Sequence, residues 1–345
     1  MNGFQRIAAA LRGGPPDTVP VMLHNFMHAA REAGVPMGQY RRDPRAVARA
    51  FIQSVEKYGY DGLLLDIDTA TLAGAVGVPV DLPEDQPARC RAGMLPTLEA
   101  VRDLPPPDVG RHFAVQTALE AASILQKHFG DEVYVRGNCD QCPFSLAGLM
   151  RHPVEWMMDL MDPRREELAR HLLDYCTEAT LQFVRLMAKT GVPMVSNGDS
   201  PAGPDLVSPD LYRRFALPYE KRIVEEAHRL GLPYVLHICG NTTRILDDMI
   251  STGADGLELD YKTDAVLAHE KMKDRTTFIG NLDPSSVLTM GTPELVDRKV
   301  RELTVLFSDT PWFILNAGCA IPATAPEENI RALILAARTS RPVRP

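Results

Sequence analysis

The sequence has little of what marks several large classes of protein. Its 345 residues carry 37 basic and 45 acidic side chains, which gives a formal net charge of −8. That balance provides no basic surface for nucleic acid. No run of residues approaches the ~18 uninterrupted apolar residues that a membrane-spanning helix needs. We therefore expect neither nucleic acid nor a membrane among the partners of this chain.

Cysteine is also scarce, with six residues in the whole chain. That number is too small for a disulfide-stapled fold. The first seven residues lack the charged and then apolar pattern of a secretory signal peptide, so we expect a cytoplasmic protein with reduced thiols. The sequence contains no G-x-G-x-x-G motif and no P-loop, the glycine-rich loops that bind dinucleotides and nucleotides.

What is present is an alternation of short aliphatic runs with longer segments whose apolar residues recur at helical spacing. This pattern is typical of β/α units around a parallel sheet. In segment 44–58, for example, Val47, Phe51 and Val55 lie one helical turn apart. Segment 209–230 has the same spacing and is predicted as one helix. The predicted strands are 19–26, 62–66, 133–138, 193–197, 233–238, 256–259, 277–281 and 312–316.

Eight strands, each followed by helical material, predict a single (β/α)₈ TIM barrel over residues 1–345 rather than an open sheet. Ser208-Pro209 and Thr292-Pro293 each provide an N-cap hydroxyl followed by proline at the first helical position. The segment near 77–112 is rich in proline and glycine and has little periodicity. We expect it to form an extended surface excursion between the second and third strands.

Polar residues stand at the ends of all eight predicted strands, where barrel enzymes place their chemistry. Loop residues after strands often only cap helices or close turns, so each of them alone is compatible with a structural role. Eight polar ends in one chain favour a functional site. The candidates at these ends include His24, Asp66, Asp140, Asn197, Asp199, His237, Glu258, Asn281 and Asn316.

A metal site is predicted from His237, Cys239 and Cys319. Residues i and i+2 of a strand point to the same side, so His237 and Cys239 can face one ion, and Cys319 follows the last strand. Imidazole and thiolate together are ligands that zinc prefers. Glu258 ends the strand between them and is the predicted fourth ligand. Cys90 and Cys176 have no ligand-spaced neighbours and are interpreted as buried apolar residues.

Three segments carry a resemblance to a known family: 237–241 (HICGN), 280–284 (GNLDP) and 316–322 (NAGCAIP). Together with 199–203 (DSPAG) they resemble the uroporphyrinogen decarboxylase superfamily, over residues 6 to 337. The H-x-C…C pattern resembles its zinc-dependent, corrinoid-linked methyltransferase branch, which includes the methylcobamide:coenzyme M methyltransferases. The zinc site of cobalamin-independent methionine synthase is similar, and this similarity supports Glu258 as a ligand.

The resemblance implies zinc-dependent transfer of a methyl group between a corrinoid (cobalamin) protein and a small molecule. That molecule is a thiol or a methoxy, methylamine or methylthio compound. The chain has no Asp-x-His-x-x-Gly stretch, so the corrinoid is expected on a partner protein. We assign Glu258, Asp199 and Asn281 as catalytic candidates. The candidates for contact with the cofactor are His24, Asn197, Asn316 and Asp140. The sequence leaves open whether the chain forms a homodimer.

Two other functions stay open at this point. The first is a decarboxylase acting on a tetrapyrrole, but those enzymes carry an early arginine-rich segment that grips substrate carboxylates. This chain has HNFMHAAR at 24–31 instead, and Cys319 where they have histidine. The second is a non-catalytic corrinoid- or tetrapyrrole-binding protein. Separately, Cys139 and Cys142 form a C-x-x-C pair, for which redox chemistry or a second metal is the alternative to a structural role.

Overall fold

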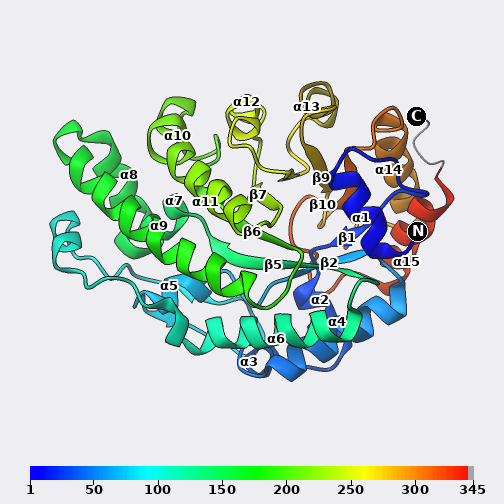
Figure 1. Ribbon diagram of the computed structural model, residues 1–345, viewed down its shortest axis with the longest axis horizontal. Coiled ribbons are helices and arrows are strands. Elements are labelled where there is room, and N and C mark those ends of the chain that lie inside the picture. The colour runs from blue at the N-terminus through cyan, green and yellow to red at the C-terminus, as the bar shows by residue number, and fades with distance from the viewer. Residues whose placement is uncertain (341–345) are drawn as a thin grey trace.

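Eight parallel strands close into a barrel in the computed structural model, which describes residues 1–340 (Figure 1). The order around the sheet is β1-β2-β5-β6-β7-β8-β9-β10. A parallel bridge between Val21 and Leu315 joins the first strand to the last. The predicted (β/α)₈ barrel is confirmed. The strands are β1 Met22–Leu23, β2 Gly62–Leu65, β5 Tyr134–Gln141, β6 Met194–Gly198, β7 Tyr234–Ile238, β8 Gly256–Leu259, β9 Thr277–Leu282 and β10 Phe313–Ala317.

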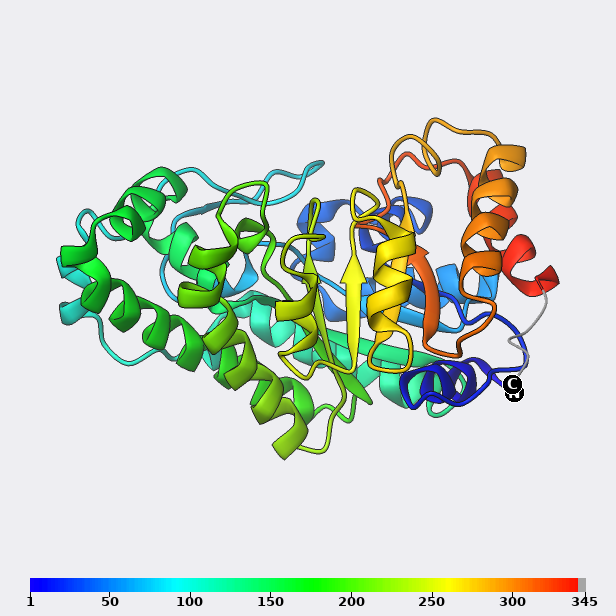
Figure 2. The same ribbon diagram turned by 90° about the horizontal axis from the view of Figure 1, so that it is seen from above.

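Helices form an outer layer around these strands, as the two perpendicular views show (Figure 1, Figure 2). They are α1 Gly3–Leu11, α2 Phe26–Glu32, α3 Met37–Tyr40, α4 Pro44–Tyr58, α5 Thr71–Ala75, α6 Phe113–Phe129, α7 Pro143–Arg151, α8 Pro153–Met161, α9 Glu166–Ala188, α10 Pro209–Phe215, α11 Leu217–Arg229, α12 Leu246–Ile250, α13 Ala265–Met272, α14 Pro293–Leu306 and α15 Glu327–Thr339. None of the described helices is long and apolar enough to cross a membrane.

Helix α1 closes the amino-terminal end of the barrel. Its buried residues Ile7, Ala10 and Leu11 pack in one cluster with residues at or near the starts of the strands, among them Met22 and Met194. Burying this apolar face favours docking of the helix because it removes hydrocarbon from water. The opposite, carboxyl end of the strands is therefore the end that can hold a functional site.

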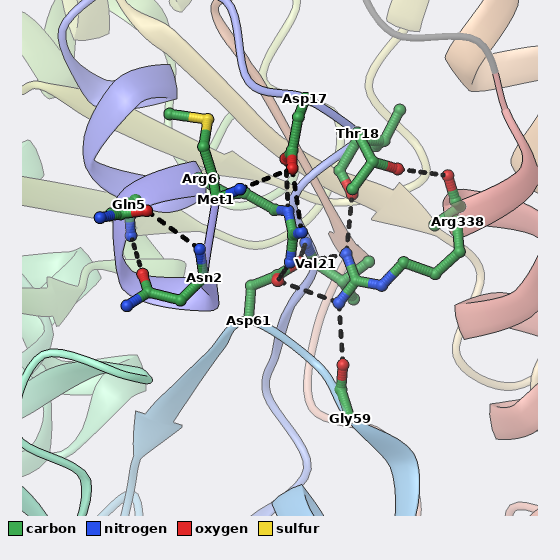
Figure 3. Close-up of polar contacts among 12 residues, drawn as sticks. Met1, Asn2, Gln5, Arg6, Asp17, Thr18, Val21, Gly59, Asp61 and Arg338 are labelled. Carbon is green, nitrogen blue, oxygen red and sulfur yellow. Dashed lines mark hydrogen bonds and ion pairs between the residues drawn. The ribbon is translucent and has the colours of Figure 1, made fainter.

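Asp61, just before β2, forms ion pairs with residues near both ends of the described chain (Figure 3). Its carboxylate lies 3.0 Å from Nη1 of Arg6 and 2.7 Å from Nη1 of Arg338. It also accepts a hydrogen bond of 2.8 Å from the backbone N–H of Val21. Asp61 is only 1% exposed, so the two arginines balance a charge that burial would otherwise make costly.

The predicted helix starts are confirmed, but the predicted helix 209–230 is wrong as a single element. Ser208 and Thr292 cap α10 and α14 by accepting from the N–H groups of Leu211 and Leu295. The segment divides into α10 and α11 because Pro218 has no N–H to donate to the carbonyl of Arg214. That carbonyl accepts from the guanidinium of Arg170 instead, at 3.4 Å.

The segment 77–112 contains a short antiparallel pair, β3 Val80–Asp81 with β4 Arg89–Cys90, and two 3₁₀ turns, η1 Leu98–Asp103 and η2 Val109–Arg111. Both turns pack against α9. In the two views this segment, coloured cyan, lies beside α8 and α9 at one end of the molecule (Figure 1, Figure 2). Leu98 and Val109 are fully buried, so the segment is anchored by apolar contacts rather than by regular secondary structure.

Candidate metal centre and its cavity

Three predicted metal ligands meet at the carboxyl ends of the strands. The ligand atoms of His237, Cys239 and Cys319 lie within 4.8 Å of one another. The Sγ atoms of the two cysteines are 3.7 Å apart, and Nε2 of His237 lies 3.0 Å from Sγ of Cys239. Two thiolates bound at 2.3 Å to a tetrahedral zinc ion are about 3.8 Å apart. The spacing of the two sulfurs therefore fits zinc without a change in the backbone.

The ring of His237 is oriented by its own backbone surroundings. Its Nδ1 lies 3.0 Å from the carbonyl oxygen of Glu258 in the neighbouring strand β8. Because a carbonyl can only accept, Nδ1 carries the proton, and Nε2 faces the sulfurs with a free lone pair in the neutral ring. Metal-bound histidines are usually fixed in this way by a hydrogen bond from the second ring nitrogen.

The three candidate ligands strongly shift one another's pKa values. Burial lowers the pKa of His237, but the Cys239 thiolate and the Glu258 carboxylate outweigh it and raise the pKa to about 9. The thiol of Cys319 donates to Cys239, and with the help of His237 it lowers the pKa of Cys239 to about 3. The same hydrogen bond raises the pKa of Cys319. The site thus already holds one thiolate, the form in which cysteine binds metal.

Glu258, the predicted fourth ligand, makes other contacts in this structure. Its Oε2 lies 2.6 Å from Nη2 of Arg136, and its Oε1 accepts a hydrogen bond of 2.9 Å from Nδ2 of Asn316. Burial raises the pKa of Glu258, yet the charge of Arg136 overcomes this and lowers it to about 2. The carboxylate is therefore ionised and faces the same cavity as the three ligands, but it lies outside their group.

A cavity of about 170 Å³ opens above the three ligands. It is lined by residues from several strand ends and from the excursion: His24, Phe26, Met27, Leu64, Asp66, Thr69, Pro87, Arg136, Asn138, Asp140, Gln141, Asn197, Gly198, Ser200, His237, Cys239, Glu258, Cys319 and Ala320. The volume is enough for a small molecule, or for one end of a larger one that enters from the mouth of the barrel.

Three of the four residues predicted to contact the cofactor line this cavity. His24 lies between two carboxylates, with Nε2 3.2 Å from Oδ2 of Asp66 and Nδ1 3.8 Å from Oε1 of Glu258. Asn197 also lines it, although its Nδ2 donates to the carbonyl of Cys139 and its Oδ1 accepts from Tyr234.

Asp140 is the third of these residues and has an unusual backbone, with φ of 60°. Its Oδ2 accepts a hydrogen bond of 2.6 Å from the N–H of Leu72, at the start of α5. Burial raises the pKa of Asp140 well above its usual value, and the nearby carboxylate of Asp66 adds to this.

The other predicted site residues do not line the cavity. Asp199 is fully buried and accepts from the backbone N–H and the hydroxyl of Ser145, so it caps the first turn of α7. Asn281 donates to the carbonyls of Asp260 and Thr263. Asn316 acts behind the lining by holding Glu258. Asp199 and Asn281 therefore have no contact with the cavity, and their catalytic roles remain predictions.

Cys139 and Cys142 are both buried in the main apolar core. Burial raises the pKa of each thiol well above its usual value. Sγ of Cys142 lies 3.6 Å from the hydroxyl of Tyr234. Neither thiol belongs to a group of metal ligands within residues 1–340. These surroundings favour the structural role for the pair.

Arg136 was missed by the sequence reasoning. It is 1% exposed, in the middle of β5, and it is bound to Glu258. The sequence does contain a signal, because a charged residue within an otherwise apolar predicted strand needs a buried partner of opposite charge. The strand pattern alone could not name that partner.

Comparison with known proteins identifies the family of this chain. A family model described as uroporphyrinogen decarboxylase (URO-D) matches residues 2–340. The chain belongs to the uroporphyrinogen decarboxylase family. The resemblance predicted from the sequence segments is thereby confirmed.

Two similar relatives are methyltransferases of methanogens. Methylcobamide:CoM methyltransferase MtbA of Methanosarcina mazei is 28% identical over 345 residues, covering 98% of each chain. MtaA of Methanosarcina barkeri is 28% identical over 340 residues, covering 96% of each. The uroporphyrinogen decarboxylase of Thermus thermophilus is 28% identical over 360 residues, covering 95% of this chain and 96% of that protein.

Among solved structures, a methyltransferase from Methanosarcina mazei superposes with a TM-score of 0.88 at 25% identity, over 97% of this chain and 98% of that chain. A putative vitamin-B12 independent methionine synthase from Listeria monocytogenes superposes at 0.54 with 14% identity, over 93% and 95% of the two chains. The second likeness concerns the fold alone.

Proposed function

We propose that this chain, a methyltransferase of the uroporphyrinogen decarboxylase family, binds zinc and moves a methyl group between a corrinoid protein and a small molecule. The observation that carries the proposal is the convergence of His237, Cys239 and Cys319 within 4.8 Å beside a cavity. The names of the two methanogen relatives support methylcobamide as one methyl carrier.

The chemistry follows from the ligand set. A zinc ion bound there would stabilise the thiolate of an incoming thiol at neutral pH, and the thiolate is the form that attacks a methyl carbon. Cys239 and Cys319 supply soft ligands that hold the metal firmly, while the carbonyl of Glu258 keeps Nε2 of His237 directed at the site. For a methoxy, methylamine or methylthio donor, the same site would polarise the leaving heteroatom.

Glu258 remains our candidate for a fourth, exchangeable ligand. Oxygen holds zinc less firmly than thiolate does, so with zinc bound a carboxylate would be the ligand that a substrate sulfur replaces, while His237, Cys239 and Cys319 would hold the ion. Arg136 and Asn316 offer the released carboxylate a ready set of donors, which are the contacts seen in this structure.

Decarboxylation of a tetrapyrrole is the rival enzymatic function, because decarboxylases are also among the relatives. That substrate carries several carboxylates and needs accessible cations. Arg136, the only Arg or Lys lining the cavity within residues 1–340, is 1% exposed and already bound to Glu258. Arg31 lies in the segment that corresponds to the arginine-rich segment of the decarboxylases, and it donates a hydrogen bond to the carbonyl of Ala323. A carrier without catalysis would have no use for a thiolate site of this kind.

A turnover assay tests the proposal. Zinc-loaded protein is mixed with methylcobalamin and a small thiol, and with cob(I)alamin and a panel of methoxy, methylamine and methylthio compounds, while the cob(I)alamin absorbance is followed. We expect transfer in at least one direction, and its loss in Cys319→Ser. Absence of transfer in both directions, with conversion of uroporphyrinogen by the same preparation, would overturn the proposal in favour of the decarboxylase.

A further inference from the structure

Carboxyl groups outnumber permanently positive side chains among the described residues that line the cavity. Asp66, Asp140 and Glu258 supply three carboxyl groups, and Arg136 is the one side chain with a permanent positive charge among the described lining residues. The two methanogen relatives are named for coenzyme M, a thiol whose far end is a sulfonate. Whether this cavity suits such an anion can be judged from the contacts of each group.

Arg136 is not available to a ligand. Its Nη2 lies 2.6 Å from Oε2 of Glu258, and the whole side chain is 1% exposed. Its Nε and Nη1 atoms have no hydrogen-bond partner but are sealed from solvent. An anion in the cavity therefore cannot reach the guanidinium without moving the lining, and it would meet a charge that Glu258 already balances.

Asp66, in contrast to Arg136, has an oxygen that is available to a ligand. One oxygen, Oδ2, contacts Nε2 of His24 at 3.2 Å, while no hydrogen bond from residues 1–340 reaches Oδ1. The neighbouring His24 is nine-tenths buried, and its Nδ1 has no hydrogen-bond partner. Unlike the sealed nitrogens of Arg136, Oδ1 of Asp66 is accessible from the cavity, so a ligand that supplies an N–H or O–H group can donate a hydrogen bond to it.

We propose that the cavity selects a small substrate whose end remote from the reacting sulfur carries an ammonium or another hydrogen-bond donor, and that it disfavours a sulfonate or carboxylate. Asp66, with His24, is the specificity-determining group. This inference rests on the proposed function, since it assumes that the sulfur binds at His237, Cys239 and Cys319. It separates this chain from relatives whose named substrate is an anionic thiol.

Three thiols that share the HS–CH₂–CH₂ unit test the inference: cysteamine, 2-mercaptoethanol and 2-mercaptoethanesulfonate. They end in an ammonium, a hydroxyl and a sulfonate. Each is titrated into protein carrying cobalt(II) in place of zinc, and the sulfur-to-metal charge-transfer absorbance reports binding without turnover. Affinities are compared per concentration of thiolate, so that differences in thiol acidity cancel.

We expect affinity to fall in the order ammonium, hydroxyl, sulfonate. The ammonium and the sulfonate should differ by at least about tenfold, because the Asp66 carboxylate attracts the first and repels the second. Asp66→Asn should bring the three affinities within about threefold of one another. Asp205→Asn, which makes the same change of charge on an exposed loop outside the cavity lining, should keep the wild-type order.

The outcomes separate the two proposals. Equal or tighter binding of the sulfonate by the wild-type protein overturns the inference and leaves the proposed function standing. Failure of all three thiols to perturb the bound cobalt(II) overturns the proposed function as well, because no sulfur then reaches the metal. The order measured on the wild-type protein decides the inference even if Asp66→Asn does not fold.

Discussion

Arg136 and Glu258 form an ion pair across the interior of the barrel, with 2.6 Å between Nη2 and Oε2. The two residues lie on β5 and β8, which are separated in the sheet by β6 and β7. Each side chain is 1% exposed. The pair therefore holds the Glu258 carboxylate from a strand that is not adjacent to its own.

Replacing Arg136 should destabilise the protein strongly. Arg136→Met leaves the Glu258 carboxylate buried without its cation, and the expected loss is about 3–5 kcal/mol in the free energy of unfolding. Urea unfolding in the presence of a chelator measures it without a contribution from metal binding. The double variant Arg136→Met, Glu258→Gln should recover much of the loss, because no buried charge then remains.

An exposed ion pair gives the matched control for this experiment. Arg91 pairs with Asp81 at 2.8 Å, but its side chain is 73% exposed. Arg91→Met should change the free energy of unfolding by less than about 1 kcal/mol. Equal effects of the two arginine substitutions on the free energy of unfolding would show that the buried pair contributes no more than the exposed one.

Zinc content should depend on both cysteines of the proposed site. Cys239→Ser and Cys319→Ser should each lose most of the metal, because a serine hydroxyl is a poor zinc ligand. The fold should persist, since the barrel has a large apolar core of its own. Elemental analysis of protein purified without chelator measures the content. Cys90→Ser, outside the metal-ligand group, should retain about one zinc per chain, and full retention in both site variants would contradict the assignment.

Glu258 should matter more for turnover than for metal retention. Glu258→Gln leaves His237, Cys239 and Cys319 in place, so it should keep more zinc than either serine variant while losing most methyl transfer. X-ray absorption of the zinc before and after thiol addition should show an oxygen neighbour replaced by sulfur. An unchanged first shell together with wild-type turnover in Glu258→Gln would leave the carboxylate as a bystander.

A buried carboxyl group on α11 should make stability depend on pH. Burial and the nearby Asp199 raise the pKa of Glu220 well above its usual value, against a hydrogen bond from Tyr212. Above about pH 4.5 the unfolded chain releases this proton and the folded chain keeps it. Stability must therefore fall as pH rises, by about 1.4 kcal/mol per pH unit, until the pH passes the folded-state pKa.

Glu220→Gln should remove this contribution, because the amide never ionises. Its stability relative to the wild-type protein should rise as the pH increases above about 4.5, as urea unfolding at each pH will show. Glu225→Gln, at an exposed position of the same helix, should follow the wild-type curve. A constant difference between Glu220→Gln and the wild-type protein at all pH values would refute the assignment.

The strands and the grouping of His237, Cys239 and Cys319 could be predicted from the sequence pattern. Alternation of short apolar runs with helical segments marks β/α units wherever they pack. His237 and Cys239 share a face because side chains on a strand repeat every two residues, and the rule that barrel sites lie at the carboxyl ends of strands then added Cys319. Even the break between α10 and α11 has a local cause in Pro218 that the apolar periodicity obscured.

Tertiary structure decided the partners of the remaining polar groups. Asp199 follows β6 but caps α7, a helix of the preceding β/α unit, and nothing near Asp199 in the sequence specifies where α7 begins in space. Glu258 meets Arg136 only because closure of the barrel brings non-adjacent strands face to face. The sequence by itself determined which residues could do the chemistry. Only the closed barrel decided which of them face the cavity, because buried polar groups bind whichever partner packing brings within reach.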